Sequence, residues 1–167
     1  MKSDYVKTLL YAYEHLPKIT KRIDEIVLKK ALASMTNYYF CEKQCVKIVN
    51  LTVQKALMIE TKYYLDRAMS RLMREEKEML DYKYFKRYPR YNLAQEDFTS
   101  RNYFRKQQKL IQTIGDNLSW LNKGNEWFEK RCMIIPFIRK VYNAVKYHDE
   151  QFLLSGMVRQ NSFKKVA

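Results

Sequence analysis

The sequence predicts an all-α protein, a multi-helix bundle, from two observations. The chain of 167 residues contains only 3 Gly and 3 Pro, whereas average usage would give about 20 of the two together. Sandwiches, small barrels and nucleotide-binding α/β units need glycine at many left-handed positions, so these classes are disfavoured. Apolar residues also recur at three- and four-residue spacing through most of the chain, which is typical of amphipathic helices.

Two helices are predicted at the start of the chain. Apolar side chains of residues 5–16 fall on one face of a helix. Ser3 is placed to cap the start of this helix, and Pro17 is placed to interrupt its end. The same period resumes over residues 19–32, with basic residues on the other side. These two helices open an N-terminal helical region that we assign to residues 1–72.

A long helix is predicted to complete this region. After an aromatic stretch at residues 37–40, interpreted as a bend, residues 46–72 contain neither Gly nor Pro. Apolar residues recur there every seven positions: Leu51, Met58, Leu65 and Leu72. Lys55 and Lys62 occupy the companion seam positions, which weakens the case for a coiled-coil homodimer but leaves it open.

Residues 73–122 are predicted to form a second, helix-turn-helix-like region. Three acids begin its first helix, Pro89 ends that helix, a short helix covers residues 93–98, and a longer helix runs from Ser100 to Leu118. We interpret the acids Glu75, Glu76 and Glu78 as structural, because carboxylates suit a helix N-terminus.

The third predicted region, residues 123–167, contains C-terminal helices and a basic tail. Pro136 is placed to begin an amphipathic helix, and the frayed tail is expected from Gly156 onward. The aromatic side chains that precede it, Trp120, Trp127 and Phe128, are interpreted as core.

No motif of the sequence indicates an enzyme, a cofactor or a metal site. It has no Walker loop, two-histidine metal helix or nucleophile elbow. A zinc site needs four N or S ligands, and His15 and His148 are isolated, so the 3 Cys are expected to be free thiols. The longest apolar run, residues 132–138, is too short to span a membrane. With no apolar signal core, a cytoplasmic location is expected.

The positive charge is concentrated in the middle of the chain. The formal net charge is +14, and residues 83–109 hold eight basic residues against two acids, which places +6 in that window. Aromatic residues are interleaved with these cations, a combination that suits a phosphate backbone. A solvated basic face over an aromatic core is the alternative interpretation.

The helix predicted after Ser100 has two faces. Basic and amide side chains fall on one side, and Phe104, Leu110, Ile111, Ile114 and Leu118 fall on the other. Arg and Asn near the start of such a helix can reach guanine and adenine edges in a major groove. The predicted DNA-binding residues are Arg87, Arg90, Ser100, Arg101, Asn102, Arg105, Lys106 and Lys109.

Three stretches between Glu75 and Ile111 carry a resemblance to a known family; they read EEKEMLDYKYF, NLA and FTSRNYFRKQQKLI. This segment resembles the C-terminal, region 4-like helix-turn-helix of RNA polymerase sigma factors. It is most similar to the short sigma-like regulators of phages and mobile elements. The resemblance implies an embedded helix-turn-helix, a Ser100 cap, DNA-facing Arg101, Asn102, Arg105 and Lys106, and packing by Tyr103 and Phe104. The turn sequence Glu96-Asp97-Phe98-Thr99 lacks the family's usual glycine.

These observations lead to one functional hypothesis and two rivals. The leading hypothesis is a non-enzymatic, sequence-specific transcription regulator that binds double-stranded DNA, with RNA polymerase or a second protomer as a further partner. The first rival is a helical protein-interaction module of a phage or mobile element that binds an acidic host protein, because positive charge attracts either partner. The second rival is RNA binding, in which Tyr84 to Tyr91 would stack on bases.

Overall fold

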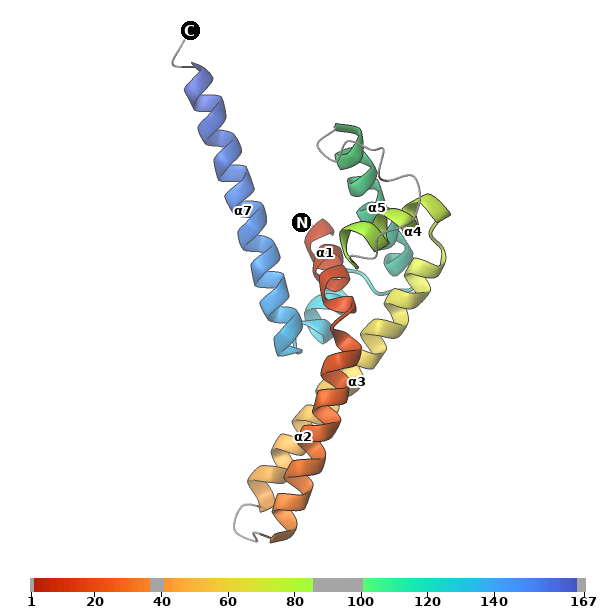
Figure 1. Ribbon diagram of the computed structural model, residues 1–167, viewed down its shortest axis with the longest axis vertical. Coiled ribbons are helices and arrows are strands. Elements are labelled where there is room, and N and C mark those ends of the chain that lie inside the picture. Colours follow the sequence, from red (N-terminus) through yellow and green to blue (C-terminus); the bar gives the residue numbers. More distant parts are fainter. Residues whose placement is uncertain (1, 37–40, 86–100, 165–167) are drawn as a thin grey trace.

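The computed structural model describes residues 2–36, 41–85 and 101–164, and the side chains of residues 3–150 within those ranges. In these ranges the chain forms seven α-helices and one π-helical turn, without a strand (Figure 1). The predicted all-α class is confirmed. None of the described helices combines the length and the hydropathy that a membrane span requires.

The first two helices follow each other with a short break. α1 spans Lys2–Tyr13 and α2 spans Leu16–Thr36. Pro17 lies in the first turn of α2, where its missing N–H costs no helical hydrogen bond. Ser3 lies inside the first turn of α1, and its hydroxyl donates to the Asp4 carboxylate at 3.3 Å, so it does not precede the helix as a cap would.

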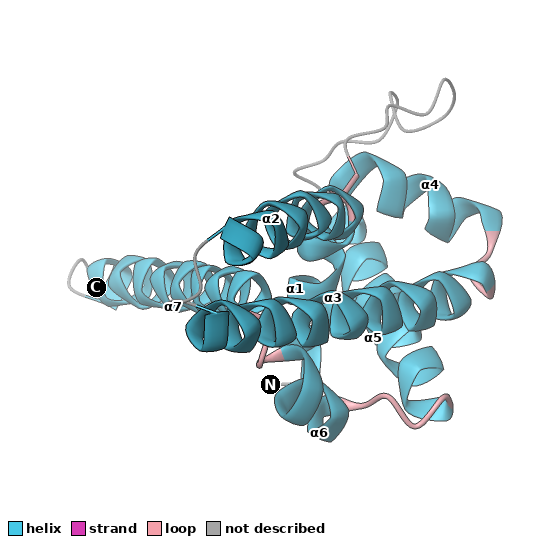
Figure 2. Ribbon diagram, turned by 90° about the horizontal axis from the view of Figure 1, so that it is seen from below, coloured by secondary structure: helices cyan, strands magenta, loops and turns pink. Residues whose placement is uncertain are grey.

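α2 and the 30-residue helix α3, Cys41–Ser70, pack side by side as an antiparallel hairpin that projects from the rest of the molecule (Figures 1 and 2). In the seven-residue repeat, Met58 and Leu65 of α3 and Leu72 just after it are buried, whereas Leu51 is partly buried. Lys55 on the same helix forms an ion pair with Asp24 of α2 at 2.5 Å. Residues of this repeat therefore pack within a single chain.

The remaining helices surround α1. α4 spans Arg74–Lys83, α5 spans Arg101–Trp120 and the short α6 spans Asn125–Trp127. The π-helical turn η3, Phe128–Cys132, follows at once. α7 spans Pro136–Lys164, so it begins at the predicted proline and continues through the segment expected to be a frayed tail.

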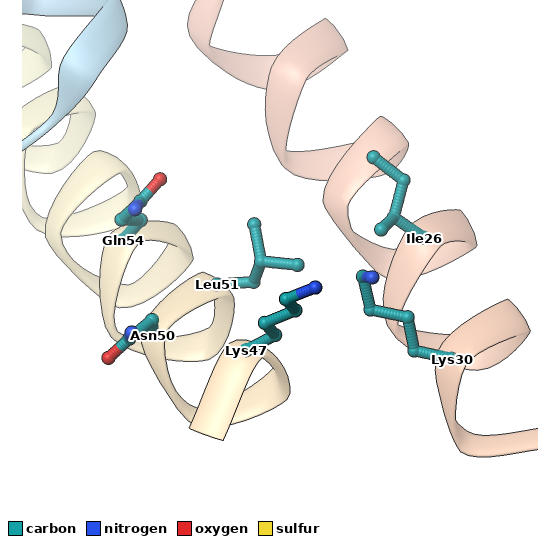
Figure 3. A pocket seen from close by; sticks show the side chains of 6 residues that line it. All are labelled: Ile26, Lys30, Lys47, Asn50, Leu51 and Gln54. Atoms are coloured by element: carbon teal, nitrogen blue, oxygen red, sulfur yellow. The ribbon is translucent and has the colours of Figure 1, made fainter. Parts of the chain in front are cut away.

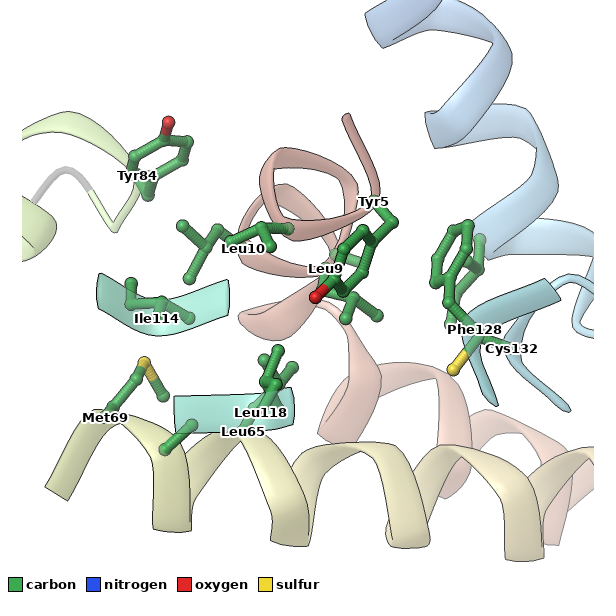
Figure 4. Close-up of a cluster of buried hydrophobic side chains, with 14 of the residues drawn as sticks. Tyr5, Leu9, Leu10, Leu65, Met69, Tyr84, Ile114, Leu118, Phe128 and Cys132 are labelled. Atoms are coloured by element: carbon green, nitrogen blue, oxygen red, sulfur yellow. The ribbon is translucent and has the colours of Figure 1, made fainter. Parts of the chain in front are cut away.

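One buried cluster holds these elements together (Figure 4). Leu9 and Leu10 of α1 are fully buried at its centre, and α1 packs against α3, α5 and α7. Side chains from residues 1–72, 73–122 and 123–167 all enter this cluster. The three predicted regions therefore share a core. The expected bend at 37–40 and the short helix at 93–98 lie outside the described residues.

Candidate nucleic-acid interface

α5 is anchored by one buried face. Its buried side chains are Tyr103, Gln107, Leu110, Ile111, Ile114 and Leu118, and they face α1, α3 and α4. Leu118 and Ile114 have no exposed surface at all. Because a core contact fixes this face, the opposite face of α5 has a defined orientation toward solvent.

A buried tyrosine joins the end of α4 to α5. Burial raises the pKa of the Tyr84 phenol well above its ordinary range, despite a side-chain hydrogen bond with Gln107 of α5. The Tyr84 ring also contacts Tyr11 of α1 edge-on, with centroids 4.9 Å apart. Tyr84 therefore has a structural role at this position, and it is not available to stack on a base.

The opposite face of α5 carries the predicted DNA-binding residues. The side chains of Arg101, Asn102, Arg105, Lys106 and Lys109 are all exposed. The helix contains no acidic residue before Asp116. The described part of the candidate site is thus a basic and amide surface on a helix whose other face is buried. We call these five residues the α5 basic face.

The remaining predicted DNA-binding residues, Arg87, Arg90 and Ser100, lie outside the described residues. α4 does pack against α5. The segment between them, residues 86–100, would contain the support helix and the turn of a helix-turn-helix, and it is not described.

Two aromatic side chains differ from the sequence prediction. Phe104 was placed on the buried face of α5, but it is 51% exposed, and Tyr103 is buried in its place. Trp120 was interpreted as core together with Trp127 and Phe128, but it is 66% exposed, whereas the other two are buried. The 3.6-residue period places Phe104 at the border of the buried face, and Trp120 lies on the same side of α5 as Lys109.

Two of the three acids at the start of α4, Glu76 and Glu78, have structural partners in this helix and its N-cap. The Met73 backbone N–H donates to the Glu76 carboxylate at 3.0 Å, which satisfies one of the free donors at the helix start. Arg74 forms an ion pair with Glu78 at 3.1 Å on the same helix. These contacts agree with the structural interpretation of the acids.

The cysteines are free thiols in two different environments. Cys41 and Cys45 are exposed at the start of α3, and a hydrogen bond with Cys41 raises the pKa of the Cys45 thiol. Cys132 is buried, and burial raises its pKa to about 12 even though the Thr61 hydroxyl contacts its sulfur at 3.5 Å. Within the described residues, no group of three His, Cys, Asp or Glu is arranged to hold a metal ion.

α2 and α3 carry a second exposed surface, which was not predicted from the sequence. Where α2 and α3 lie far from the core, residues 24–36 and 41–56 contain no buried side chain. We call this the distal hairpin. A shallow hollow between its helices is lined by Ile26, Lys30, Lys47, Asn50, Leu51 and Gln54 (Figure 3). Its large exposed apolar side chains are Leu28, Leu32, Met35, Val46, Val49 and Val53. Their three- and four-residue spacing could have indicated a second apolar face on each helix.

No family model, curated protein or solved structure matches this chain, so its function has to be inferred from the two surfaces themselves.

Proposed function

We propose that this protein is a non-enzymatic regulator of transcription that binds double-stranded DNA through the α5 basic face. One observation carries the proposal: five basic or amide side chains are exposed together on a helix whose opposite face is anchored in the core. In helix-turn-helix proteins, the helix that enters the major groove is fixed to the body of the protein and exposes its polar face.

The side chains of this face have the chemistry of base and phosphate contacts. Arginine can donate two hydrogen bonds to guanine, and asparagine can pair with adenine in the same way. Arg101, Asn102 and Arg105 lie in the first turns of α5, the part of a recognition helix that contacts bases. Lys106 and Lys109 are suited to phosphates, which fix the position of the helix without reading sequence.

The similarity of residues 75–111 to sigma-factor helix-turn-helix regions supports the more specific proposal of a sigma-like regulator. In that proposal, RNA polymerase or a second protomer is an additional partner of the N-terminal helices. Either partner would use a surface other than α5, because α5 is occupied by DNA.

Selection from a random duplex library tests this function. The full-length protein is mixed with the library, bound duplexes are recovered, and their sequences are determined. We expect an enriched motif that is lost in Arg101→Ala/Arg105→Ala. The matched control is Arg22→Ala, which removes an exposed arginine from α2. No enriched motif, or the same enrichment in the Arg101→Ala/Arg105→Ala variant, would contradict the proposal.

The distal hairpin favours a second function, binding of an acidic protein partner. Its exposed apolar side chains lie beside Lys29, Lys43 and Lys47, for which the structure gives no ion pair with any described residue. Exposed apolar surface is typical of protein-interaction sites. A synthetic amphipathic helix with a leucine face and a glutamate face is a suitable probe. Binding that is lost in Leu32→Ser/Val49→Ser, with duplex binding unchanged, would support this function, and absence of binding would contradict it.

A further inference from the structure

An exposed tryptophan with an arginine stacked on it lies at the far end of α5. The guanidinium carbon of Arg71 lies 3.8 Å from the Trp120 ring centroid. The tryptophan is nevertheless 66% exposed. Because the arginine covers one face of the indole, most of this exposure belongs to the other face, which is open to a planar ligand.

Further cation–ring pairs continue along α3. The Arg67 guanidinium lies 5.7 Å from the Tyr63 ring centroid and donates a hydrogen bond to its hydroxyl at 3.2 Å. Tyr63 is 52% exposed. The Lys123 ammonium lies 4.4 Å from the ring centroid of Tyr64. We call Tyr63, Arg67, Arg71, Trp120 and Lys123 the cation–ring strip.

The turn after α5 holds two members of this strip in place. Asn122 adopts a left-handed backbone conformation with φ of 57°, which asparagine tolerates better than most residues. The Lys123 backbone N–H then donates to the Leu118 carbonyl at 2.8 Å and closes the helix end. In addition, the Asn117 side-chain amide donates to the Ala68 carbonyl at 3.1 Å, which ties α5 to α3 next to Arg71.

The acids closest to the strip along α3 are engaged elsewhere. Glu60 accepts hydrogen bonds from Arg131 at 2.6 Å and from the Trp127 indole at 3.4 Å, and it also interacts electrostatically with Lys123, a member of the strip. Asp66 accepts from Lys62 at 2.7 Å and from the Tyr13 hydroxyl. On α5, Asp116 lies one turn before Trp120 and is the acid closest to the strip on that helix. Among the described residues, Arg67 and Arg71 contact rings and form no ion pair that the structure gives.

We propose that the cation–ring strip binds single-stranded nucleic acid. An unpaired base stacks on the open face of Trp120, and the cations Arg67, Arg71 and Lys123 contact the adjacent phosphates. Alternation of exposed rings and cations is the arrangement used for single strands, since every base has a face that can stack. A duplex cannot use Trp120 in this way, because its bases are stacked on one another. The strip is also more basic than apolar, which favours nucleic acid over a protein.

This site is separate from the one proposed for duplex DNA. Trp120 lies eleven residues beyond Lys109 on the same helix, roughly 16 Å along its axis at the standard rise. Arg67 belongs to a different helix, α3, and Arg71 directly follows that helix. The two proposals therefore stand or fall independently, and different variants test them.

Intrinsic fluorescence gives a direct test, because the chain has only 2 Trp. In a Trp127→Phe variant of the full chain, Trp120 is the sole tryptophan. Titration with a short oligo(dT) should quench its emission in a saturable manner that weakens with salt. Fluorescence anisotropy of labelled oligo(dT) measures the affinity of the unmodified chain, so the result does not rely on the Trp127→Phe variant.

Variants separate stacking from general charge attraction. By anisotropy, Trp120→Ala should weaken oligo(dT) binding about 5- to 150-fold, the range of one lost base stack. Trp120→Phe should retain part of the affinity. The control Phe104→Ala removes an exposed ring of α5 that carries no stacked cation from the described residues, and it should leave oligo(dT) binding unchanged. Absence of quenching, unchanged affinity in Trp120→Ala, or equal weakening of duplex and oligo(dT) binding would overturn the proposal.

Discussion

The α5 basic face and the distal hairpin are both exposed and both carry lysines, but they differ in what lies behind them. α5 rests on side chains with no exposed surface, such as Ile114 and Leu118. The distal hairpin has no buried side chain in residues 24–36 or 41–56, and its helices are held partly by the Lys55–Asp24 ion pair. The comparison shows that two basic surfaces of one chain can differ in the groups beneath and beside their cations.

The comparison also separates two kinds of partner. A rigid polar helix is suited to a duplex, whose groove admits a helix of fixed orientation. A hairpin with exposed Leu28, Leu32 and Val49 beside lysines is suited to a partner with apolar and acidic groups. One chain therefore carries two surfaces of different chemistry, and α5 lies far from the tip of the distal hairpin (Figure 1).

The largest expected effect is on the free energy of unfolding, which should depend on α5 far more than on the distal hairpin. Ile114→Ala should lower the free energy of unfolding by about 2–5 kcal/mol, because it leaves a cavity in a fully buried site. Val49→Ala on the distal hairpin should change it by less than about 0.5 kcal/mol, because the side chain is 59% exposed. Urea unfolding followed by circular dichroism measures both. Equal losses would show that the hairpin packs against something in solution.

The next effect separates base contacts from phosphate contacts on α5. Arg105→Ala should weaken binding to the selected duplex by about 1–3 kcal/mol and reduce the preference for that duplex. Lys106→Ala should weaken binding to selected and scrambled duplexes alike. Competition measurements with both duplexes distinguish the two results. If Arg105→Ala left the preference intact, the assignment of base contacts to this residue would be wrong.

A smaller effect concerns the buried thiol of the core. Cys132 has a folded-state pKa of about 12, whereas an unfolded thiol titrates near pH 8.5. Above that pH the unfolded chain releases a proton that the folded chain keeps, so stability falls as pH rises, by at most about 1.4 kcal/mol per pH unit. Unfolding measured from pH 8 to 9.5 should show this slope, and Cys132→Ala should lose it. In the native protein, a thiol reagent should modify Cys41 and Cys45 but not Cys132.

The smallest effect concerns the ion pair of the hairpin. Lys55→Ala should cost only about 0.2–1 kcal/mol, because Lys55 and Asp24 are both partly exposed. The cost should shrink further in high salt. A loss of several kcal/mol in urea unfolding would contradict the small contribution expected of a partly exposed ion pair.

Much of the fold follows from local rules that the sequence displays. Pro17 and Pro136 lie in the first turns of α2 and α7, and the residues between 46 and 70 form one uninterrupted helix. Local rules did not locate the end of α7, because a helix extends through a basic segment as long as no residue breaks it.

The side chains at the surfaces were harder to predict than the helices. Arg101, Asn102 and Arg105 are exposed as the helical period predicted. Trp120 was expected in the core because aromatic residues are usually buried. Its one described ring contact with a cation is with Arg71, which directly follows α3 and lies 49 residues earlier in the chain. Contacts between distant residues of this kind are set by packing, and periodicity within one helix does not reveal them.

The central claim, that DNA binds the α5 basic face, is tested most directly by the salt dependence of duplex affinity. Dissociation constants are measured at several salt concentrations for the wild-type protein, for Lys106→Ala/Lys109→Ala, which removes the two proposed phosphate contacts, and for Lys43→Ala/Lys47→Ala. Both variants remove two exposed cations. We predict that the α5 variant lowers the slope of log affinity against log salt by about 2, and that the hairpin variant leaves it unchanged. Equal slopes for the two variants would contradict the claim.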